Sequence, residues 1–154
     1  MTARSVTHAT FVLDRVYPAA PARVFSAFSD PQAKARWFGA PADSGWVQKE
    51  AGMEFRVGGR EISVGEMKDG LKIAFRALYQ DIVPNERIVY TYDMEMNGKR
   101  ISVSVATIEF KAEGGGTRLK VTEQGAYLDG LDNAPQRELG TKDLLDALGR
   151  SLAG

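Results

Sequence analysis

Residues 71–125 read LKIAFRALYQDIVPNERIVYTYDMEMNGKRISVSVATIEFKAEGGGTRLKVTEQG. Apolar and polar side chains alternate along much of this stretch, and the alternation is interrupted by PNE at 84–86, NG at 97–98 and GGG at 114–116. A period of two is typical of strands with one buried face, and the interruptions contain residues that favour tight turns. The stretch therefore predicts four antiparallel strands in a meander, and this meander decides the fold.

The two-residue turn at Asn97-Gly98 also predicts a register for the strands on either side of it. Counting outward from that turn, residues at equal distances should face one another across the ladder. The predicted pairs are Met96 with Lys99, Met94 with Ile101, Tyr92 with Val103, and Tyr90 with Val105.

The apolar residues change from odd to even sequence positions, or the reverse, at two places in this stretch. Phe75, Ala77 and Tyr79 share one parity and Ile82 has the other, which predicts a β-bulge at Gln80-Asp81. The second change separates Val103 and Val105 from Ile108 and Phe110. It indicates either another bulge or a strand whose two halves are buried on opposite faces.

The segment before the meander predicts a strand and two short helices. Residues 7–17 are rich in β-formers, and PAAP at 18–21 ends the strand because proline cannot continue a ladder. Pro21 suits a first helical turn, followed by an apolar stripe, and Asp30 caps a second helix that begins at Pro31. The stripe consists of Val24, Phe25 and Phe28.

Further strands and a long helix complete the pattern. Residues 53–67 predict strands that bend at Gly58-Gly59, and Asp69-Gly70 marks the next reversal. Residues 133–152 predict a helix about 30 Å long, capped by Asp132 or Asn133. Its apolar face carries Leu144, Leu148 and Leu152.

These elements predict one α+β domain over residues 1–154, with a curved antiparallel sheet of six or seven strands and a long C-terminal helix. Paired glycines, bulges and strand twist bend a sheet toward one face. A straight helix laid in a curved sheet touches it along a line and leaves a gap at one or both ends. A small-molecule site would lie in such a gap.

The chain resembles bacterial proteins similar to the C-terminal domain of the Hsp-ninety ATPase activator homologue, within the START-like, polyketide cyclase-like (SRPBCC) superfamily. The resemblance runs from about Val12 to Leu152. It rests on five blocks in the family's order: APARVFSAFSDPQAKARWFGAP, VGGRE, LYQDIVPNERIVYTYDM, GGGTRLKVTEQGAYLDG and RELGTKDLLDALGRSL.

The resemblance implies a helix-grip fold, in which an antiparallel sheet wraps around the C-terminal helix with a hydrophobic tunnel between them. Members of the superfamily bind lipids, steroids, plant hormones or polyketides, a few catalyse cyclisations or dehydrations, and the eukaryotic namesake stimulates a chaperone ATPase. Many members carry Gly-Trp near the start of the last helix, where this sequence has Gly140-Thr141.

The candidate ligand-binding residues follow from the apolar face and from the aromatic loop near residues 35–46. Under the resemblance the loop closes the mouth of the cavity, whereas the alternative is that its rings complete the core. Tyrosine hydroxyls on the apolar face need a partner, which a ligand or water would supply. The candidates are Trp37, Phe38, Trp46, Phe55, Phe75, Tyr79, Tyr90, Tyr92, Met94, Val103, Val105, Leu144 and Leu148.

Charge and composition exclude several function classes. Twenty Lys and Arg balance twenty Asp and Glu, which disfavours a nucleic-acid surface. The chain has no cysteine and one histidine, His8, so a thiolate site, a transition-metal site and a Ser-His-Asp triad are all disfavoured. No export signal or membrane span is apparent, and we expect a cytoplasmic protein without a cofactor.

Acid–base chemistry is harder to exclude, because Asp, Glu, Arg and Tyr suffice for cyclases and dehydratases. Five charged residues lie on or beside strands, and most of them are expected on solvated faces: Arg15, Arg56, Glu61, Arg76 and Glu123. No catalytic residue is assigned.

Three hypotheses follow from the sequence. The first is a non-enzymatic carrier of a small hydrophobic ligand, as a monomer or a homodimer. The second is a metal-free cyclase or dehydratase, which needs an ionisable side chain that points inward. The third is a module that contacts a chaperone through its outer surface.

Overall fold

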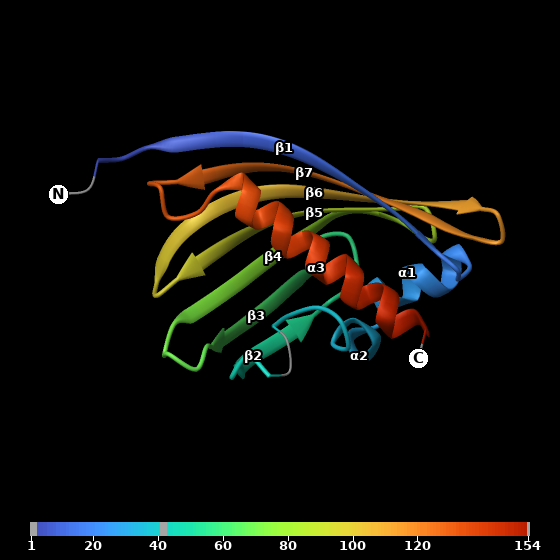
Figure 1. Ribbon diagram of the computed structural model, residues 1–154, viewed down its shortest axis with the longest axis horizontal. Coiled ribbons are helices and arrows are strands. Elements are labelled where there is room, and N and C mark those ends of the chain that lie inside the picture. Colours follow the sequence, from blue (N-terminus) through green and yellow to red (C-terminus); the bar gives the residue numbers. More distant parts are fainter. Residues whose placement is uncertain (1–2, 41–42, 154) are drawn as a thin grey trace.

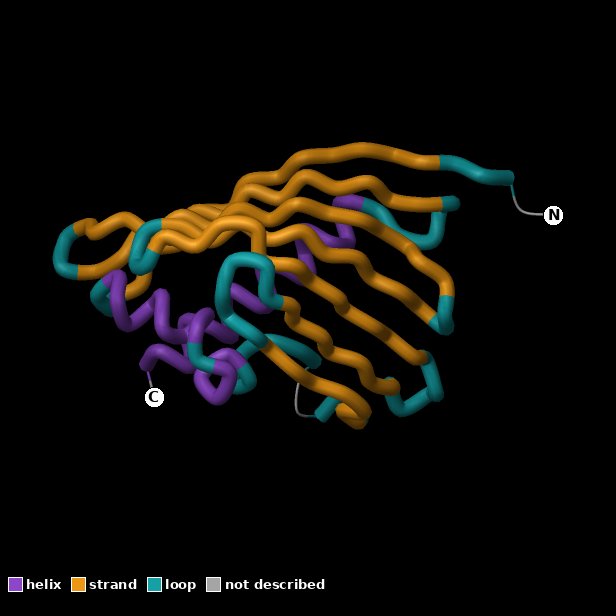
Figure 2. The backbone as a smooth tube through the Cα atoms, turned by 180° about the vertical axis from the view of Figure 1, so that it is seen from behind, coloured by secondary structure: helices purple, strands orange, loops and turns teal. Residues whose placement is uncertain are grey.

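The computed structural model describes residues 3–40 and 43–153. The described residues form a seven-stranded antiparallel sheet in the order β1-β7-β6-β5-β4-β3-β2, with helix α3 across its concave face (Figure 1). Seen from behind, the strands curve around the side on which the helices lie (Figure 2). The elements are β1 Val6–Tyr17, α1 Pro21–Ser29, α2 Pro31–Lys34, β2 Val47–Met53, β3 Arg60–Glu66, β4 Lys72–Val83, β5 Arg87–Met96, β6 Lys99–Glu113, β7 Gly116–Leu128 and α3 Ala134–Ala153.

The predicted meander is confirmed as β4 to β7, with turns at the three predicted interruptions. Asn97 and Gly98 adopt φ angles of 51° and 81°, the left-handed conformation that a tight two-residue hairpin turn requires. The bulge predicted at Gln80-Asp81 is also confirmed, because the register between β4 and β5 shifts between Tyr79 and Asp81. The bulge keeps the apolar side chains of β4 on one face.

The predicted register beyond the Asn97-Gly98 turn is wrong after its first pair. Met96 faces Lys99 as predicted, but the register shifts at the next step and leaves Ile101 as the extra residue. Met94 then faces Ser102, Tyr92 faces Ser104, and Tyr90 faces Ala106, in place of Ile101, Val103 and Val105.

This shift explains the second change of parity. The bulge lies at Ile101, and from Ser102 to Glu113 strand β6 pairs with β7 in one continuous register. Ser104, Ala106, Ile108 and Phe110 are therefore buried on one face, while Val103, on the other face, is 46% exposed. Neither predicted alternative describes this arrangement, since the bulge precedes Val103.

Helices α1 and α2 close one end of the sheet. The predicted stripe on α1 is buried, and the rings of Phe25 and Phe28 pack edge-to-face on Phe110 at centroid distances of 5.3 and 5.5 Å. The Asp30 side chain accepts a hydrogen bond from the Gln32 backbone N–H, which confirms the predicted cap of α2. This end of the molecule is a filled core.

The strands predicted over residues 53–67 have different bounds. Strand β2 ends at Met53, and residues 54–59 connect it to β3. Gly58 adopts φ +83° and donates its N–H to the Tyr79 carbonyl at 2.8 Å, while a Cβ on Gly59 would lie 2.0 Å from the Glu54 carbonyl oxygen. The glycine pair therefore forms a tight connection between two strands.

Helix α3 begins as predicted, with Asn133 as its cap: the Asn133 Oδ1 accepts from the Gln136 N–H at 2.9 Å. Leu148 is fully buried, and the Tyr17 hydroxyl donates to the Leu145 carbonyl at 2.7 Å, which fixes the second half of the helix on the β1 side of the sheet. Within the described residues, no helix is both long and apolar enough to cross a membrane.

Candidate functional site

A cavity of about 1280 Å³ lies between the concave face of the sheet and α3. The sheet contributes apolar and aromatic side chains from β4 to β7, the α2 end contributes the segment from Lys34 to Ala40, and α3 contributes residues from Arg137 to Ser151. Helix α3 packs on β1, where the Tyr17 hydroxyl holds it, while the sheet continues beyond this contact through β4 to β2.

Eight of the thirteen predicted binding residues line this cavity. Three come from the aromatic loop, four from β4 and β5, and one from α3: Trp37, Phe38, Trp46, Phe75, Tyr90, Tyr92, Met94 and Leu144. Those on the sheet form one wall, in which the rings of Phe75 and Tyr92 are 5.1 Å apart and those of Tyr90 and Tyr92 are 5.7 Å apart.

Three further predicted residues lie in the core beside the cavity. Phe55 packs edge-to-face on Tyr79 at 5.0 Å, and Tyr79 and Leu148 are at most 2% exposed. These three side chains are enclosed because α1 and the β2–β3 connection pack over the end of the sheet where they lie.

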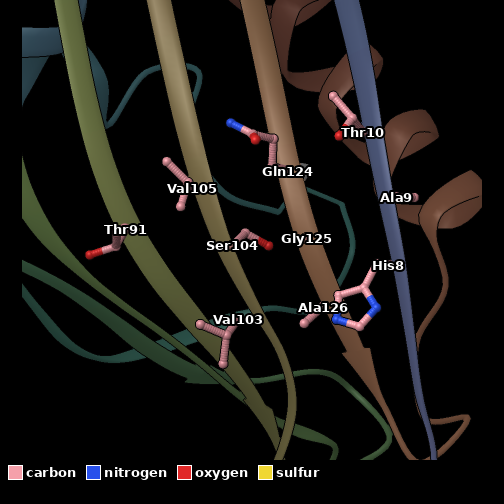
Figure 3. A pocket seen from close by; sticks show the side chains of 10 residues that line it. All are labelled: His8, Ala9, Thr10, Thr91, Val103, Ser104, Val105, Gln124, Gly125 and Ala126. Carbon is pink, nitrogen blue, oxygen red and sulfur yellow. The ribbon is translucent and has the colours of Figure 1, made fainter.

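Val103 and Val105 are placed differently from the prediction. The bulge at Ile101 turns both side chains to the convex face, away from α3. There they line a shallow hollow of about 530 Å³ with His8, Thr10 and Gln124 (Figure 3). They do not share a surface with the other candidates.

The aromatic loop combines both roles that the sequence left open. Trp37 is 6% exposed, donates its indole N–H to the Ala27 carbonyl at 2.9 Å and packs on Phe28, so it completes the core. It also borders the cavity with Phe38. Trp46 lies over Gly65, where a Cβ would come within 2.3 Å of the indole ring.

A buried ion pair lies at the α2 end of the cavity. The Lys34 Nζ is 2.6 Å from Glu61 Oε1, and the Tyr79 hydroxyl donates to the same oxygen at 2.5 Å. The ammonium also lies 4.3 Å from the centroid of the Phe38 ring, a cation–π contact. Burial lowers the pKa of Lys34, and the Glu61 carboxylate opposes that shift.

A second polar cluster lies where α3 begins. The Arg137 Nη1 donates to the Tyr92 hydroxyl at 2.9 Å, and the Tyr92 hydroxyl donates to Glu123 Oε1 at 2.7 Å. The Arg137 Nη2 donates to Ser102 Oγ at 2.8 Å and also binds Asp132. The guanidinium thus links α3 to β5, β6 and the segment that precedes the helix.

One carboxyl oxygen of Glu123 lacks a hydrogen bond from the described residues. Its Oε2 is buried and accepts no hydrogen bond from any of the described residues, although Arg137 Nη1 lies 3.9 Å away. The residue is 4% exposed and borders the cavity. Burial raises the pKa of Glu123, while the hydrogen bond from Tyr92 and the charge of Arg137 oppose the shift.

The expectation that the strand-borne charges face solvent is wrong for two of the five. Arg56 and Arg76 are solvated, and Arg15 is partly so, but Glu61 and Glu123 are buried. Their partners Lys34 and Arg137 were missed by the sequence reasoning. For Lys34 the sequence offers one signal, its spacing. Lys34 precedes Trp37 by three residues, and residues three apart lie on the same side of a helical segment.

Within residues 3–40 and 43–153, no group of three His, Cys, Asp or Glu side chains is placed to hold a metal ion. His8 lies on the convex face (Figure 3). The side chains that line the cavity can donate and accept hydrogen bonds and make apolar contacts.

Comparison with known proteins agrees with this architecture. The family model described as Activator of Hsp90 ATPase homolog 1-like protein matches residues 18–153. A search of curated proteins finds no match.

Solved structures show the same fold. A protein of Rhizobium leguminosarum is 44% identical over 99% of both chains, with a TM-score of 0.93. One from Rhizobium loti is 43% identical over 96% of this chain and 99% of the other, with a TM-score of 0.88. An AHSA1-like protein from Aeromonas hydrophila, 20% identical over 94% of this chain and 92% of the other, has a TM-score of 0.71 and supports the helix-grip fold alone. The chain therefore belongs to the family of Activator of Hsp90 ATPase homolog 1-like proteins.

Proposed function

We propose that this protein binds a small, largely apolar molecule in the cavity between the sheet and α3. The observation that carries the proposal is a cavity of about 1280 Å³ whose wall combines aromatic rings with the buried Glu123, whose Oε2 accepts no hydrogen bond from the described residues. Binding sites for small molecules are typically apolar hollows with a few well-placed polar groups.

Apolar burial would supply most of the affinity. Each 100 Å² of ligand surface removed from water contributes about 2.5 kcal/mol before the entropy of association is subtracted. The polar groups at the two ends, Lys34 and Glu123, would set the orientation of the ligand. The resemblance to the START-like superfamily, whose members bind lipids, steroids, hormones or polyketides, supports the same function.

The test is displacement of a fluorescent lipid analogue, combined with native mass spectrometry of the protein as it is purified. Thr141 lines the cavity from α3, and its replacement by tryptophan would fill part of the space. We expect Thr141→Trp to weaken binding of the analogue by tenfold or more, and to leave the fold intact.

Lys142→Trp is the matched control, because residue 142 is next on the same helix and exposed. This variant should bind as the wild type does. Equal binding by both tryptophan variants would place the analogue outside the cavity and would refute the proposal.

An acid–base enzyme of the cyclase or dehydratase kind is the second candidate. It is favoured by one observation, a cavity-lining carboxyl group of raised pKa that is hydrogen-bonded to Tyr92. Deuterium exchange into an enolisable ketone, followed by NMR, would detect such chemistry, and Glu123→Gln should abolish it.

The family description raises a chaperone contact as a third alternative. A pull-down with the Hsp90 chaperone and a measurement of its ATPase rate test that alternative directly. Absence of both effects would remove it.

A further inference from the structure

We infer that the cavity selects uncharged ligands that carry a carbonyl group or a similar hydrogen-bond acceptor, and that Glu123 holds this group by donating from a protonated Oε2. The inference rests on the proposed function, because it names the class of ligand for the same cavity. It depends on the charge balance of the buried groups and on the direction of their hydrogen bonds.

The buried charges balance only when Glu123 is protonated. Lys34 and Glu61 form a pair at 2.6 Å, which is neutral as a whole. Arg137 contacts two carboxyl groups, Asp132 directly and Glu123 Oε2 at 3.9 Å. One guanidinium faces two carboxyl groups, so an ionised Glu123 would leave a buried negative charge in excess, which is costly in a low dielectric.

The direction of the hydrogen bonds assigns the proton of a neutral Glu123 to Oε2. A guanidinium is a donor only, so the Tyr92 oxygen accepts from Arg137 at 2.9 Å. The Tyr92 proton then points to Glu123 Oε1 at 2.7 Å, which makes Oε1 an acceptor. The proton of the neutral carboxyl group is therefore on Oε2, the buried oxygen that has no hydrogen-bond partner among the described residues.

Several titratable groups face Glu123 from the elements around it. They are Tyr90 and Tyr92 on β5, Tyr127 on β7, Asp132 before α3 and Arg137 on α3. Burial raises the pKa of each of these tyrosines, so they stay neutral near pH 7. Burial also raises the pKa of Glu123, so this carboxyl group keeps its proton to a higher pH than an ordinary glutamate does.

Charged ligands fit this site less well. An anionic headgroup against Oε2 would lie near the negative charge of Asp132 and would compete with Asp132 for Arg137. A cationic headgroup would be placed near Arg137 and, at the other end of the cavity, near Lys34. A neutral carbonyl oxygen accepts a hydrogen bond from the protonated Oε2 and adds no charge.

The experiment uses 6-propionyl-2-(dimethylamino)naphthalene, an uncharged fluorescent ketone whose emission responds to hydrogen bonding at its carbonyl. Its affinity for the full-length protein is measured from about pH 5 to pH 9. We expect wild-type affinity to fall about tenfold as Glu123 loses its proton, the worth of one neutral hydrogen bond. The propyl analogue, which lacks the carbonyl oxygen, should bind with no such pH dependence.

Glu123→Gln supplies an amide N–H donor at every pH. This variant should bind the ketone within about threefold of the wild type at low pH and should show a flat pH profile. Glu109→Gln makes the same chemical change at an exposed position of β6 and should keep the wild-type profile.

Each other result would count against the inference. A flat wild-type profile for the ketone, with binding still blocked by Thr141→Trp, would refute the inference and leave the proposed function standing. Loss of ketone binding in a folded Glu123→Gln variant, or tighter binding of an amine or sulfonate analogue, would show that the ionised carboxylate or another group recognises the ligand. Failure of every naphthalene analogue to bind would refute the proposed function, and this inference with it.

Discussion

Lys34 and Glu61 are buried partners that depend on each other. Their side chains are 6% and 8% exposed, and the Glu61 oxygen that binds Lys34 also accepts the Tyr79 hydroxyl. In a pair this well enclosed, removal of one partner leaves a polar group that neither water nor protein satisfies. The pair therefore joins α2 to β3, and replacement of either Lys34 or Glu61 alone breaks this contact.

We expect Lys34→Met to lower the free energy of unfolding by about 3–5 kcal/mol, because Glu61 would stay buried without its cation. The double variant Lys34→Met/Glu61→Gln should recover most of that loss, since it removes the unpaired charge. Urea unfolding of the wild type, both single variants and the double variant measures the coupling. Additive losses in the double variant would contradict the assignment of a coupled pair.

At the same scale, the sequence identified the apolar wall better than its charged ends. Phe75, Tyr90 and Tyr92 were recognised because alternation places them on one apolar face. Glu61 and Glu123 were assigned to solvent because charged residues are mostly exposed. Their burial depends on Lys34 and Arg137, which come from helices distant in the sequence, and no local pattern encodes such a meeting.

At the scale of elements, turns and bulges determine which side chains reach the cavity. The bulge at Gln80 was predictable, because the apolar parity changes across it. The bulge at Ile101 was not, since the alternation of Val103 and Val105 is equally consistent with either face of β6. A shift of one residue there moved two candidates to the convex face, as expected for a side-chain period of two.

The connection between β2 and β3 provides a test at this scale. Gly58 has φ +83°, and a Cβ there would meet the Arg56 side chain at an ordinary contact distance of 3.7 Å, whereas a Cβ on Gly59 would meet the Glu54 carbonyl oxygen at 2.0 Å. We expect Gly58→Ala to cost about 1–2 kcal/mol of stability, from the left-handed conformation alone. Gly59→Ala should lower the stability further, because the backbone at Glu54 would have to move to make room for the new Cβ.

Chemical denaturation compares the two variants. Gly114→Ala, which is also left-handed (φ +56°) with open space, is the control for conformational cost and should match Gly58→Ala. If Gly59→Ala were the milder of the two, the close approach to Glu54 would not limit this connection.

At the scale of the whole molecule, the cavity results from the curvature of the sheet and the straightness of α3. The polar groups of the cavity come together only when distant segments of the chain pack in the folded protein. A curved sheet and a straight helix that is packed on one side leave a space that the alternation and the helix length together predicted. The net charge of zero hides an internal distribution in which opposite charges meet across α2, β3, β7 and α3. The fold was therefore predictable from periodicity, while the chemistry of the cavity required the tertiary arrangement.

The same internal distribution predicts how the stability of the whole molecule changes with pH. Burial raises the pKa of Glu123 above its ordinary value of 4.5, so between 4.5 and the raised pKa the folded chain binds more protons than the unfolded chain. Stability contributed by this group is therefore fully present below pH 4.5 and is lost as the pH rises through that window.

Glu123→Gln lacks this titration, and its free energy of unfolding relative to the wild type should increase with pH across the window and level off above it. Urea unfolding at a series of pH values, with Glu109→Gln as the reference variant, measures the difference. A difference that is constant with pH would mean that Glu123 keeps its ordinary pKa in the folded protein, and that the cavity holds an ionised carboxylate.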